Sequence, residues 1–200
     1  MERGTRRRLG IVTKDNMLPR THILFHHSAI AGLEPQYDRV RDYHNRGGLD
    51  KNGKKKWPAG YGCQYAFFLE KNGEIIEANP PERVTWHSGS WLWNARSIAI
   101  ALAGSLLTEQ VTTEQLRALV ALTNALQARF SIPDGNLLDH RDVRNTSCPG
   151  ARIKEMVLRE KANHFSSKID HLRKVIDRTE PPRKTRLQRA LARFLALVPL

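Results

Sequence analysis

The segment RSIAIALAG, residues 96–104, is a continuous run of mainly apolar residues with the length of a β-strand. Such a run predicts a central strand that is covered on both faces. Two earlier segments also have the character of strands. THILFHHSA, residues 21–29, is rich in apolar and aromatic residues, and CQYAFFLEKNGEIIEA, residues 63–78, predicts two strands joined by a hairpin turn at Asn72-Gly73.

Two helices are expected between these strands and after them. The first would start near Pro35, which suits a first helical turn, and stop at Gly47. The second covers residues 112–130, where Thr112 and Gln115 have the spacing of a capping box and an apolar stripe follows. The intervening segment LDKNGKKKWPAGYG is expected to be a polar loop. Strands mixed with helices predict an α/β fold with a mixed central β-sheet flanked by helices.

The formal net charge of +13 is concentrated at the two ends of the chain. Residues 1–20 carry six basic and two acidic side chains, residues 21–150 carry fourteen and thirteen, and residues 151–200 carry thirteen and five. A basic end can bind a polyanion. We therefore expect a basic N-terminal extension at 1–20, an α/β domain at 21–152 and a basic tail at 153–200.

The tail is expected to form two amphipathic helices hinged at Pro181-Pro182. Its second segment, RKTRLQRALARFLALVPL, places leucines on one side and Arg186, Arg189 and Arg193 on the other. These helices could pack on the domain, form a homodimer with a second copy, or bind an anionic wall polymer or a membrane surface through the basic face. Specific nucleic-acid binding is not expected, because no recognition motif accompanies the charge.

Export, membrane and disulfide signals are weak. No apolar run approaches the roughly 18 residues that a membrane span needs, so the chain is not expected to be an integral membrane protein. The basic start lacks the apolar stretch of a signal peptide, so none is expected. Cys63 and Cys148 are the two cysteines, which excludes a disulfide framework and leaves thiols available for a metal.

The segment LLDHRDVRNTSCPG, residues 137–150, places Cys148 in a polar turn eight residues after His140. That setting suits a metal ligand better than a core residue. A catalytic zinc site needs three protein ligands and one open position for water. Either His26 or His27 could be the third ligand, but neighbouring residues of a strand face opposite ways, so only one is expected to bind. The pattern alone does not choose between them.

Four blocks, ILFHHSA, CQYAFFLEKNG, WHSG with SIAIALAG, and HRDVRNTSCPG, occur in an order that resembles the zinc-dependent N-acetylmuramoyl-L-alanine amidases of the peptidoglycan-recognition-protein and phage-endolysin type. The resemblance runs from about residue 21 to 150 and does not include the tail. It implies a peptidoglycan-recognition-protein-like fold and a Zn²⁺ cofactor. The implied zinc ligands are His26, His140 and Cys148.

The same resemblance implies roles for four further residues. Tyr65 and Thr146 match catalytic positions beside the zinc, where a tyrosine hydroxyl would stabilise the developing oxyanion and a threonine would position the water or the carbonyl. His87 and Asn94 match positions that line the substrate groove of relatives. Zinc suits amide hydrolysis because it lowers the pKa of bound water from about 16 to roughly 7 and polarises the carbonyl.

The expected function is therefore zinc-dependent hydrolysis of the amide between the lactyl group of N-acetylmuramic acid and L-alanine in peptidoglycan. A phage or prophage endolysin fits best, held in the host cytoplasm until it is released to the cell wall or periplasm. A bacterial autolysin or a recycling amidase is an alternative within the same chemistry. A non-catalytic peptidoglycan-binding module is the alternative from another class.

Overall fold

The computed structural model of the chain describes residues 18–32, 35–49, 52, 55–57, 60, 62–178 and 183–196. It divides into two compact units, Met1–Lys154 and Glu155–Leu200. The first unit holds the α/β fold and the second holds most of the helical tail.

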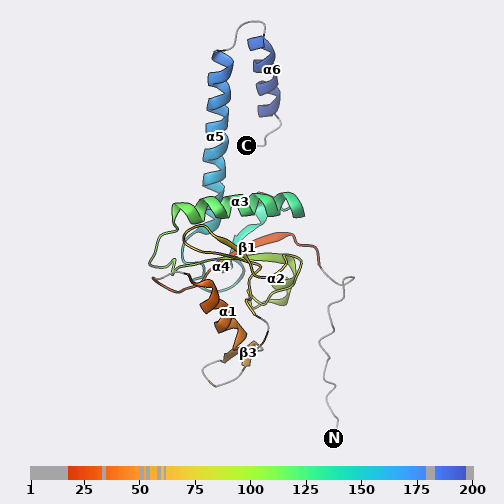
Figure 1. Cartoon of the computed structure of the whole chain (residues 1–200). Helices are drawn as coiled ribbons and strands as arrows, with labels where there is room; N and C mark the ends of the chain where they lie inside the picture. Colours follow the sequence, from red (N-terminus) through yellow and green to blue (C-terminus); the bar gives the residue numbers. More distant parts are fainter. Residues whose placement is uncertain are drawn as a thin grey trace. The chain divides into compact units, whose positions relative to one another are not determined.

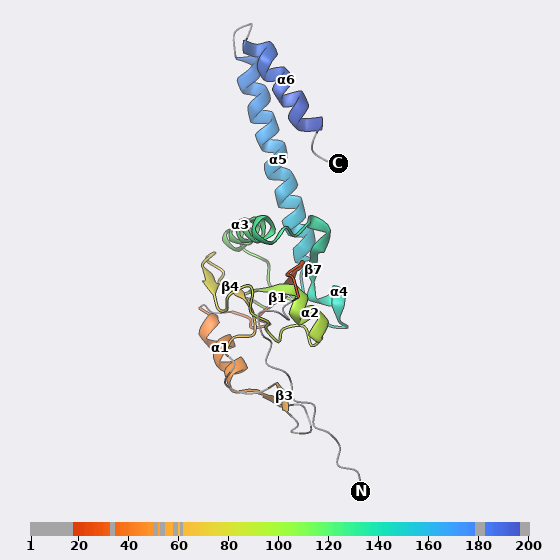
Figure 2. The same ribbon diagram turned by 90° about the vertical axis from the view of Figure 1, so that its right-hand side faces the viewer.

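The first unit is built on a five-stranded mixed sheet with the order β5-β4-β6-β1-β7 (Figures 1 and 2). Strand β1 is parallel to both β6 and β7, β4 is parallel to β6, and β5 is antiparallel to β4. The bounds are β1 (His22–His27), β4 (Phe67–Leu69), β5 (Ile75–Glu77), β6 (Ser97–Leu102) and β7 (Leu137–Asp139). The predicted mixed α/β fold and its hairpin at Asn72-Gly73 are confirmed.

Strand β6 occupies the middle of the sheet, as the apolar run at 96–104 predicts. All six of its residues are buried, and Ile23, Leu24 and Phe25 of the neighbouring β1 are fully buried. Strands covered on both faces lose the alternation of apolar and polar residues, because neither face meets water. The sheet therefore forms the core of the unit.

Helices cover both faces of this sheet (Figures 1 and 2). Helix α3 (Thr113–Phe130) lies on one face, and α1 (Tyr37–Asn45) and α2 (Trp91–Arg96) lie on the other. The predicted capping box is present, since the Gln115 backbone N–H donates to Thr112 Oγ1 at 3.0 Å and the Gln115 side chain accepts from the Thr112 N–H. The Gln115 amide also donates to the Ala103 carbonyl at 2.9 Å, which joins α3 to the end of β6.

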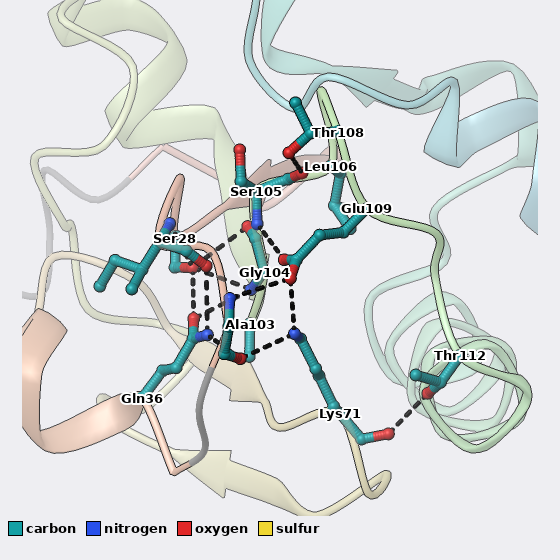
Figure 3. A network of polar contacts seen from close by, with 12 residues as sticks. Ser28, Gln36, Lys71, Ala103, Gly104, Ser105, Leu106, Thr108, Glu109 and Thr112 are labelled. Atoms are coloured by element: carbon teal, nitrogen blue, oxygen red, sulfur yellow. Dashed lines mark hydrogen bonds and ion pairs between the residues drawn. The ribbon is translucent and has the colours of Figure 1, made fainter.

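A polar network braces the carboxyl ends of β1, β4 and β6 (Figure 3). The Gly104 N–H, just after β6, donates to Ser28 Oγ and to Gln36 Oε1, both at 2.9 Å. Glu109 accepts from the Ser105 N–H at 2.8 Å and forms an ion pair with Lys71 at 3.1 Å. These bonds hold together the loops that leave the sheet at the edge where His26 lies.

Several short elements were not expected from the sequence. The predicted polar loop at 49–62 contributes β3 (Lys55–Trp57), which pairs antiparallel with β2 (Gly48–Leu49), so the expectation of a plain loop is wrong there. Strand β7, helix α2, the short helix α4 (His140–Val143) and the turn η2 (Asp134–Asn136) are each six residues or fewer. Arg20, placed by the sequence in the N-terminal extension, is buried and donates to the carbonyls of Asn94 and Ala95.

The tail is helical, as predicted. Helix α5 (Ile153–Asp177) begins at the end of the first unit and continues through the second, where α6 (Arg183–Ala196) runs beside its last turns (Figures 1 and 2). Ile169 and Ile176 of α5 are buried. The expected hinge at Pro181-Pro182 lies outside the described residues. No described helix combines the length and apolarity needed to cross a membrane.

Candidate metal centre

His26, His140 and Cys148 converge on one point at the edge of the sheet. Each offers one ligand atom, and these three atoms all lie within 4.8 Å of one another. Cys148 Sγ is 3.7 Å from His26 Nδ1, and the imidazole rings of His26 and His140 are 4.5 Å apart between centroids. Side chains separated by more than a hundred residues in sequence thus meet in one cluster.

The pairing of β1 with β7 explains how the two histidines meet. Phe25 of β1 lies opposite Asp139 of β7 in this parallel pair, so the next residues, His26 near the end of β1 and His140 just after β7, lie side by side. His140 is the first residue of α4, which a capping box between Asp139 and Asp142 holds in place. The Asp139 N–H donates to Asp142 Oδ2 at 2.9 Å in that box.

The turn that carries Cys148 is held by contacts of its own backbone. The Cys148 N–H donates to Thr146 Oγ1 at 3.2 Å, and Arg141 donates to the Gly150 carbonyl at 2.6 Å. Gly150 has a φ of +86°, and a Cβ atom there would lie 2.4 Å from the carbonyl carbon of Leu106. Glycine is therefore required, because the turn is pressed against the backbone of Leu106.

The donor set fits a zinc ion. Zinc binds imidazole nitrogen at about 2.0–2.1 Å and thiolate sulfur at about 2.3 Å, so neighbouring nitrogen and sulfur ligands of a tetrahedral site are about 3.6 Å apart. The separation of 3.7 Å between Cys148 Sγ and His26 Nδ1 matches that value. Two nitrogens and one sulfur also leave one tetrahedral position for water or substrate.

His27 faces the other way. Its Nδ1 accepts a hydrogen bond from the Leu106 N–H at 3.0 Å, and its side chain is buried. The structure therefore places His26, and not His27, in the cluster, which resolves the choice that the sequence pattern left open. The backbone of His27 still contributes, since it forms a hydrogen bond with the sulfur of Cys148.

Burial shifts the ionisation of all three side chains. Desolvation, with the neighbouring His87 and His140, lowers the pKa of His26 well below 6.5, and desolvation also lowers the pKa of His140. Both imidazoles are thus neutral near pH 7, which is the form that binds a metal. Desolvation raises the pKa of the Cys148 thiol to about 11, partly offset by the bond from the His27 backbone.

Tyr65 lies beside the cluster, with its ring centroid 5.2 Å from that of His26. Burial raises the pKa of its hydroxyl, which therefore stays protonated and able to donate at neutral pH. Tyr65 also lines a cleft of about 880 Å³ whose other walls include Ser28, Val40 and His44. Tyr65 therefore lies between the cluster and this cleft, which none of the three cluster residues lines.

His87 and Asn94, which the sequence suggests as substrate contacts, are buried, with 8% and 1% of their surfaces exposed. His87 Nδ1 is 3.0 Å from His26 Nε2, and Asn94 Oδ1 accepts the Ser88 N–H at 2.8 Å. Exposed side chains of the same segment include Leu92 and the pair Trp86 and Trp91, whose rings are 5.7 Å apart between centroids. Substrate contact by His87 and Asn94 stays a prediction.

Three residues that the sequence reading did not single out also support the cluster. Ser88 offers its carbonyl to His140, Ser97 contacts His87, and Asp139 caps α4. Asp139 could have been found, because an aspartate three residues before Asp142 is a capping signature at the start of a helix. The two serines carry no comparable signal in the sequence.

Comparison with known proteins finds similarity to amidases and to peptidoglycan-recognition proteins. Residues 16–151 match the family model described as N-acetylmuramoyl-L-alanine amidase. The solved N-acetylmuramoyl-L-alanine amidase LysC from Clostridium intestinale URNW is 30% identical, with a TM-score of 0.56 over 72% of this chain and 85% of that chain. Drosophila PGRP-LB is 25% identical, with a TM-score of 0.55 over 70% of this chain and 79% of that chain.

A curated relative matches over a shorter region. Peptidoglycan-recognition protein SC2 of Drosophila simulans is 31% identical over 90 residues, which are 44% of this chain and 48% of that protein. The matched region thus spans about half the length of this relative. The Ph2119 endolysin from a Thermus scotoductus bacteriophage shares the fold at 23% identity, with a TM-score of 0.55 over 70% of this chain and 83% of that chain.

Proposed function

The chain belongs to the N-acetylmuramoyl-L-alanine amidase family, and on that premise we propose that it is a zinc-dependent hydrolase of peptidoglycan. The bond cut is the amide between the lactyl group of N-acetylmuramic acid and L-alanine of the stem peptide. The amidase domain spans residues 21–152, between a basic extension at 1–20 and a basic tail at 153–200.

One observation carries this proposal: the three-donor cluster formed by His26, His140 and Cys148. Its ligand atoms lie within 4.8 Å of one another, and its donor types match a catalytic zinc site with one open position. A module that only bound the wall would not need a complete set of metal ligands. The cluster therefore favours catalysis over binding alone.

A zinc ion held by these ligands supplies a Lewis acid for the scissile carbonyl and lowers the pKa of bound water to about 7. Tyr65 donates its hydroxyl proton in a hydrogen bond to the carbonyl oxygen as negative charge develops there. Thr146 offers a hydroxyl beside Cys148, which can orient water or the carbonyl, although its Oγ1 also accepts the Cys148 N–H at 3.2 Å.

The cleft beside Tyr65 supplies room for the stem peptide. Its volume of about 880 Å³ lies within the roughly 300–1,000 Å³ of typical ligand sites. The exposed pair Trp86 and Trp91 adds flat aromatic surface on the segment that leads into the cluster. Substrate binding by His87 and Asn94 remains part of the proposal, although their burial favours a role beneath the site.

Digestion of purified sacculi tests the proposal directly. The protein should contain one zinc per chain, and mass spectrometry of the products should show intact glycan strands and free stem peptides that begin with L-alanine. New reducing ends, or cleavage within the peptide, would contradict the assignment of the bond. Binding to sacculi without new amino groups would support a non-catalytic peptidoglycan-binding module instead.

We propose a phage or prophage endolysin as the biological role, active on the wall after release from the host cytoplasm. A solved relative described as an endolysin amidase, LysCS from Clostridium intestinale URNW, is 30% identical to this chain. A bacterial autolysin or recycling amidase is the alternative. Lysis of cells by protein added from outside does not distinguish these roles. If the protein is expressed inside cells and lyses them only when a holin is co-expressed, the endolysin role is supported.

For the tail, we propose binding to an anionic surface, either a wall polymer or a membrane. Helix α6 carries five basic residues and no acidic residue, and Leu187 and Leu195 are exposed on the side opposite Arg189 and Arg193. A basic face opposite exposed leucines is typical of helices that lie on anionic interfaces. A homodimer through the tail is the competing proposal, and a doubled mass by light scattering would favour it.

A further inference from the structure

Both imidazoles of the metal cluster are hydrogen-bonded, through the ring nitrogen that faces away from the metal position, to one segment at residues 87–94. We propose that His87 and Asn94 are positioning residues that fix the tautomer and the orientation of His26 and His140 for zinc. This inference rests on the proposed zinc site and assigns to these two residues a task beneath the metal.

The tautomer of His26 follows from a chain of hydrogen bonds. Ser97 Oγ donates its single proton to the Trp93 carbonyl at 2.5 Å, so toward His87 Nε2, at 3.3 Å, it can only accept. His87 therefore carries its proton on Nε2 and presents a bare Nδ1. That atom accepts from His26 Nε2–H at 3.0 Å.

The consequence lies at the other nitrogen of His26. With its proton held on Nε2, the imidazole presents an unprotonated Nδ1, the atom 3.7 Å from Cys148 Sγ. A neutral imidazole binds zinc through its unprotonated nitrogen. The Trp93 carbonyl, three hydrogen bonds away, thus decides which nitrogen of His26 is free to face the metal.

A second branch of the same segment holds His140. Its Nε2–H donates to the Ser88 carbonyl at 3.2 Å, which leaves Nδ1 bare. Ser88 is held by Asn94, whose Oδ1 accepts from the Ser88 N–H at 2.8 Å and from the Ser88 hydroxyl at 2.7 Å. Asn94 is almost fully buried, so these bonds are not exchanged with water.

The segment therefore aligns two ligands that come from different elements, β1 and α4. Groups that orient metal-binding histidines typically contribute about 10–100-fold in metal affinity. His87 and Asn94 are buried and are not among the three donors, which distinguishes this role from catalysis.

A matched pair of variants tests His87 in the full-length protein. His87→Asn keeps an acceptor oxygen near the place of Nδ1, whereas His87→Leu has nearly the same size and no acceptor. We expect His87→Leu to weaken zinc binding by about 10–100-fold in competition with a chromophoric chelator, and His87→Asn to restore most of that loss. The cobalt(II) spectrum of His87→Leu should also lose its tetrahedral intensity.

Asn94 is tested in the same way. Asn94→Asp keeps an oxygen that can accept from Ser88, and Asn94→Leu does not. Leu92→Ala, at an exposed position of the same segment, is the matched control and should bind zinc like the unmodified protein. Thermal unfolding in the presence of a chelator identifies any variant that has lost its fold. If one variant of a residue is unfolded, the zinc affinity of the folded variant of that residue is compared with that of the unmodified protein.

Two results would overturn the inference. One is zinc affinity within twofold of the unmodified protein in both leucine variants. The other is an equal loss in His87→Asn and His87→Leu, which would show that packing and not the hydrogen bond matters. Because zinc binding is measured without peptidoglycan, tight zinc binding by a protein that does not cut sacculi would overturn the proposed function and leave this inference standing.

Discussion

The metal cluster and the α6 helix obtain their properties in opposite ways. His26 comes from one segment of a nearly neutral region and His140 and Cys148 from another more than a hundred residues away, and the two histidines are held by hydrogen bonds to buried groups. Helix α6 is one continuous segment with five basic residues, and its described arginines are exposed. The first region depends on geometry and the second on charge, so they should respond to different changes.

The largest expected effect is at the cluster itself. Cys148→Ser removes the thiolate ligand and should lower zinc affinity by more than the roughly 10–100-fold typical of groups behind the ligands, and abolish release of stem peptides. Cys63→Ser is the matched control, because Cys63 is buried in the apolar cluster of Val40 and Phe68 and outside the donor group. Hydrolysis at full rate by Cys148→Ser would remove the zinc assignment.

Tyr65→Phe should separate chemistry from metal binding within the same region. The variant loses one donor to the oxyanion, which typically costs about 10²–10³-fold in kcat. Zinc content and the affinity for wall fragments should stay unchanged, since Tyr65 is not among the three donors. A parallel loss of zinc would show instead that the tyrosine supports the ligands.

The tail should respond to charge and not to geometry. Replacing Arg189 and Arg193 together by glutamine removes two charges, each worth about 1 kcal/mol near an anionic membrane surface. Binding to phosphatidylglycerol vesicles should then weaken by about 30-fold. Zinc affinity should not change, and binding of the unmodified protein should fall with added salt because exposed charges are screened. Salt-independent binding would contradict the proposal.

The smallest expected effect is a count of protons. At pH 6.0, the pKa of His26, held well below 6.5, leaves that ring neutral, and the lowered pKa of His140 reduces the protonation of the second ring, whereas the Cys148 thiol, with its pKa of about 11, is protonated. Zinc binding should therefore release the proton of Cys148 and less than about one further proton from His140. Histidines with an ordinary pKa of about 6.5 would raise the release to about 2.5 protons. Calorimetry in buffers of different ionisation enthalpy measures this number.

Much of the fold was predictable because its main elements have strong local signals. The apolar run of β6, the hairpin at Asn72-Gly73 and the capping box at Thr112 each specify their structure within a few residues, and all three are confirmed. Strand β7 and helix α2 were missed because they are short, and pairing with neighbours rather than propensity stabilises them.

The site was predictable in part for a similar reason. His140 and Cys148 lie close together in a polar turn, and the resemblance to a known family adds His26. The proposed role of His87 was hidden, because the polar segment between Trp86 and Trp91 looks exposed while the fold buries its histidine. Hydrogen bonds that join residues 26, 87 and 97 arise from tertiary structure and leave no spacing pattern in the sequence.

The turn that carries Cys148 is packed against the backbone of Leu106, and this affects how the site binds its ion. Gly150 rests on the backbone of Leu106, and the Leu106 N–H is held by His27, the neighbour of His26. None of these contacts uses a donor atom of the cluster. The ligands should therefore lose little conformational entropy when they bind an ion. Little of the binding free energy is then spent on ordering the site. Unlike a zinc finger, whose chain is unfolded without metal, this protein should lose and regain its ion reversibly with its fold intact.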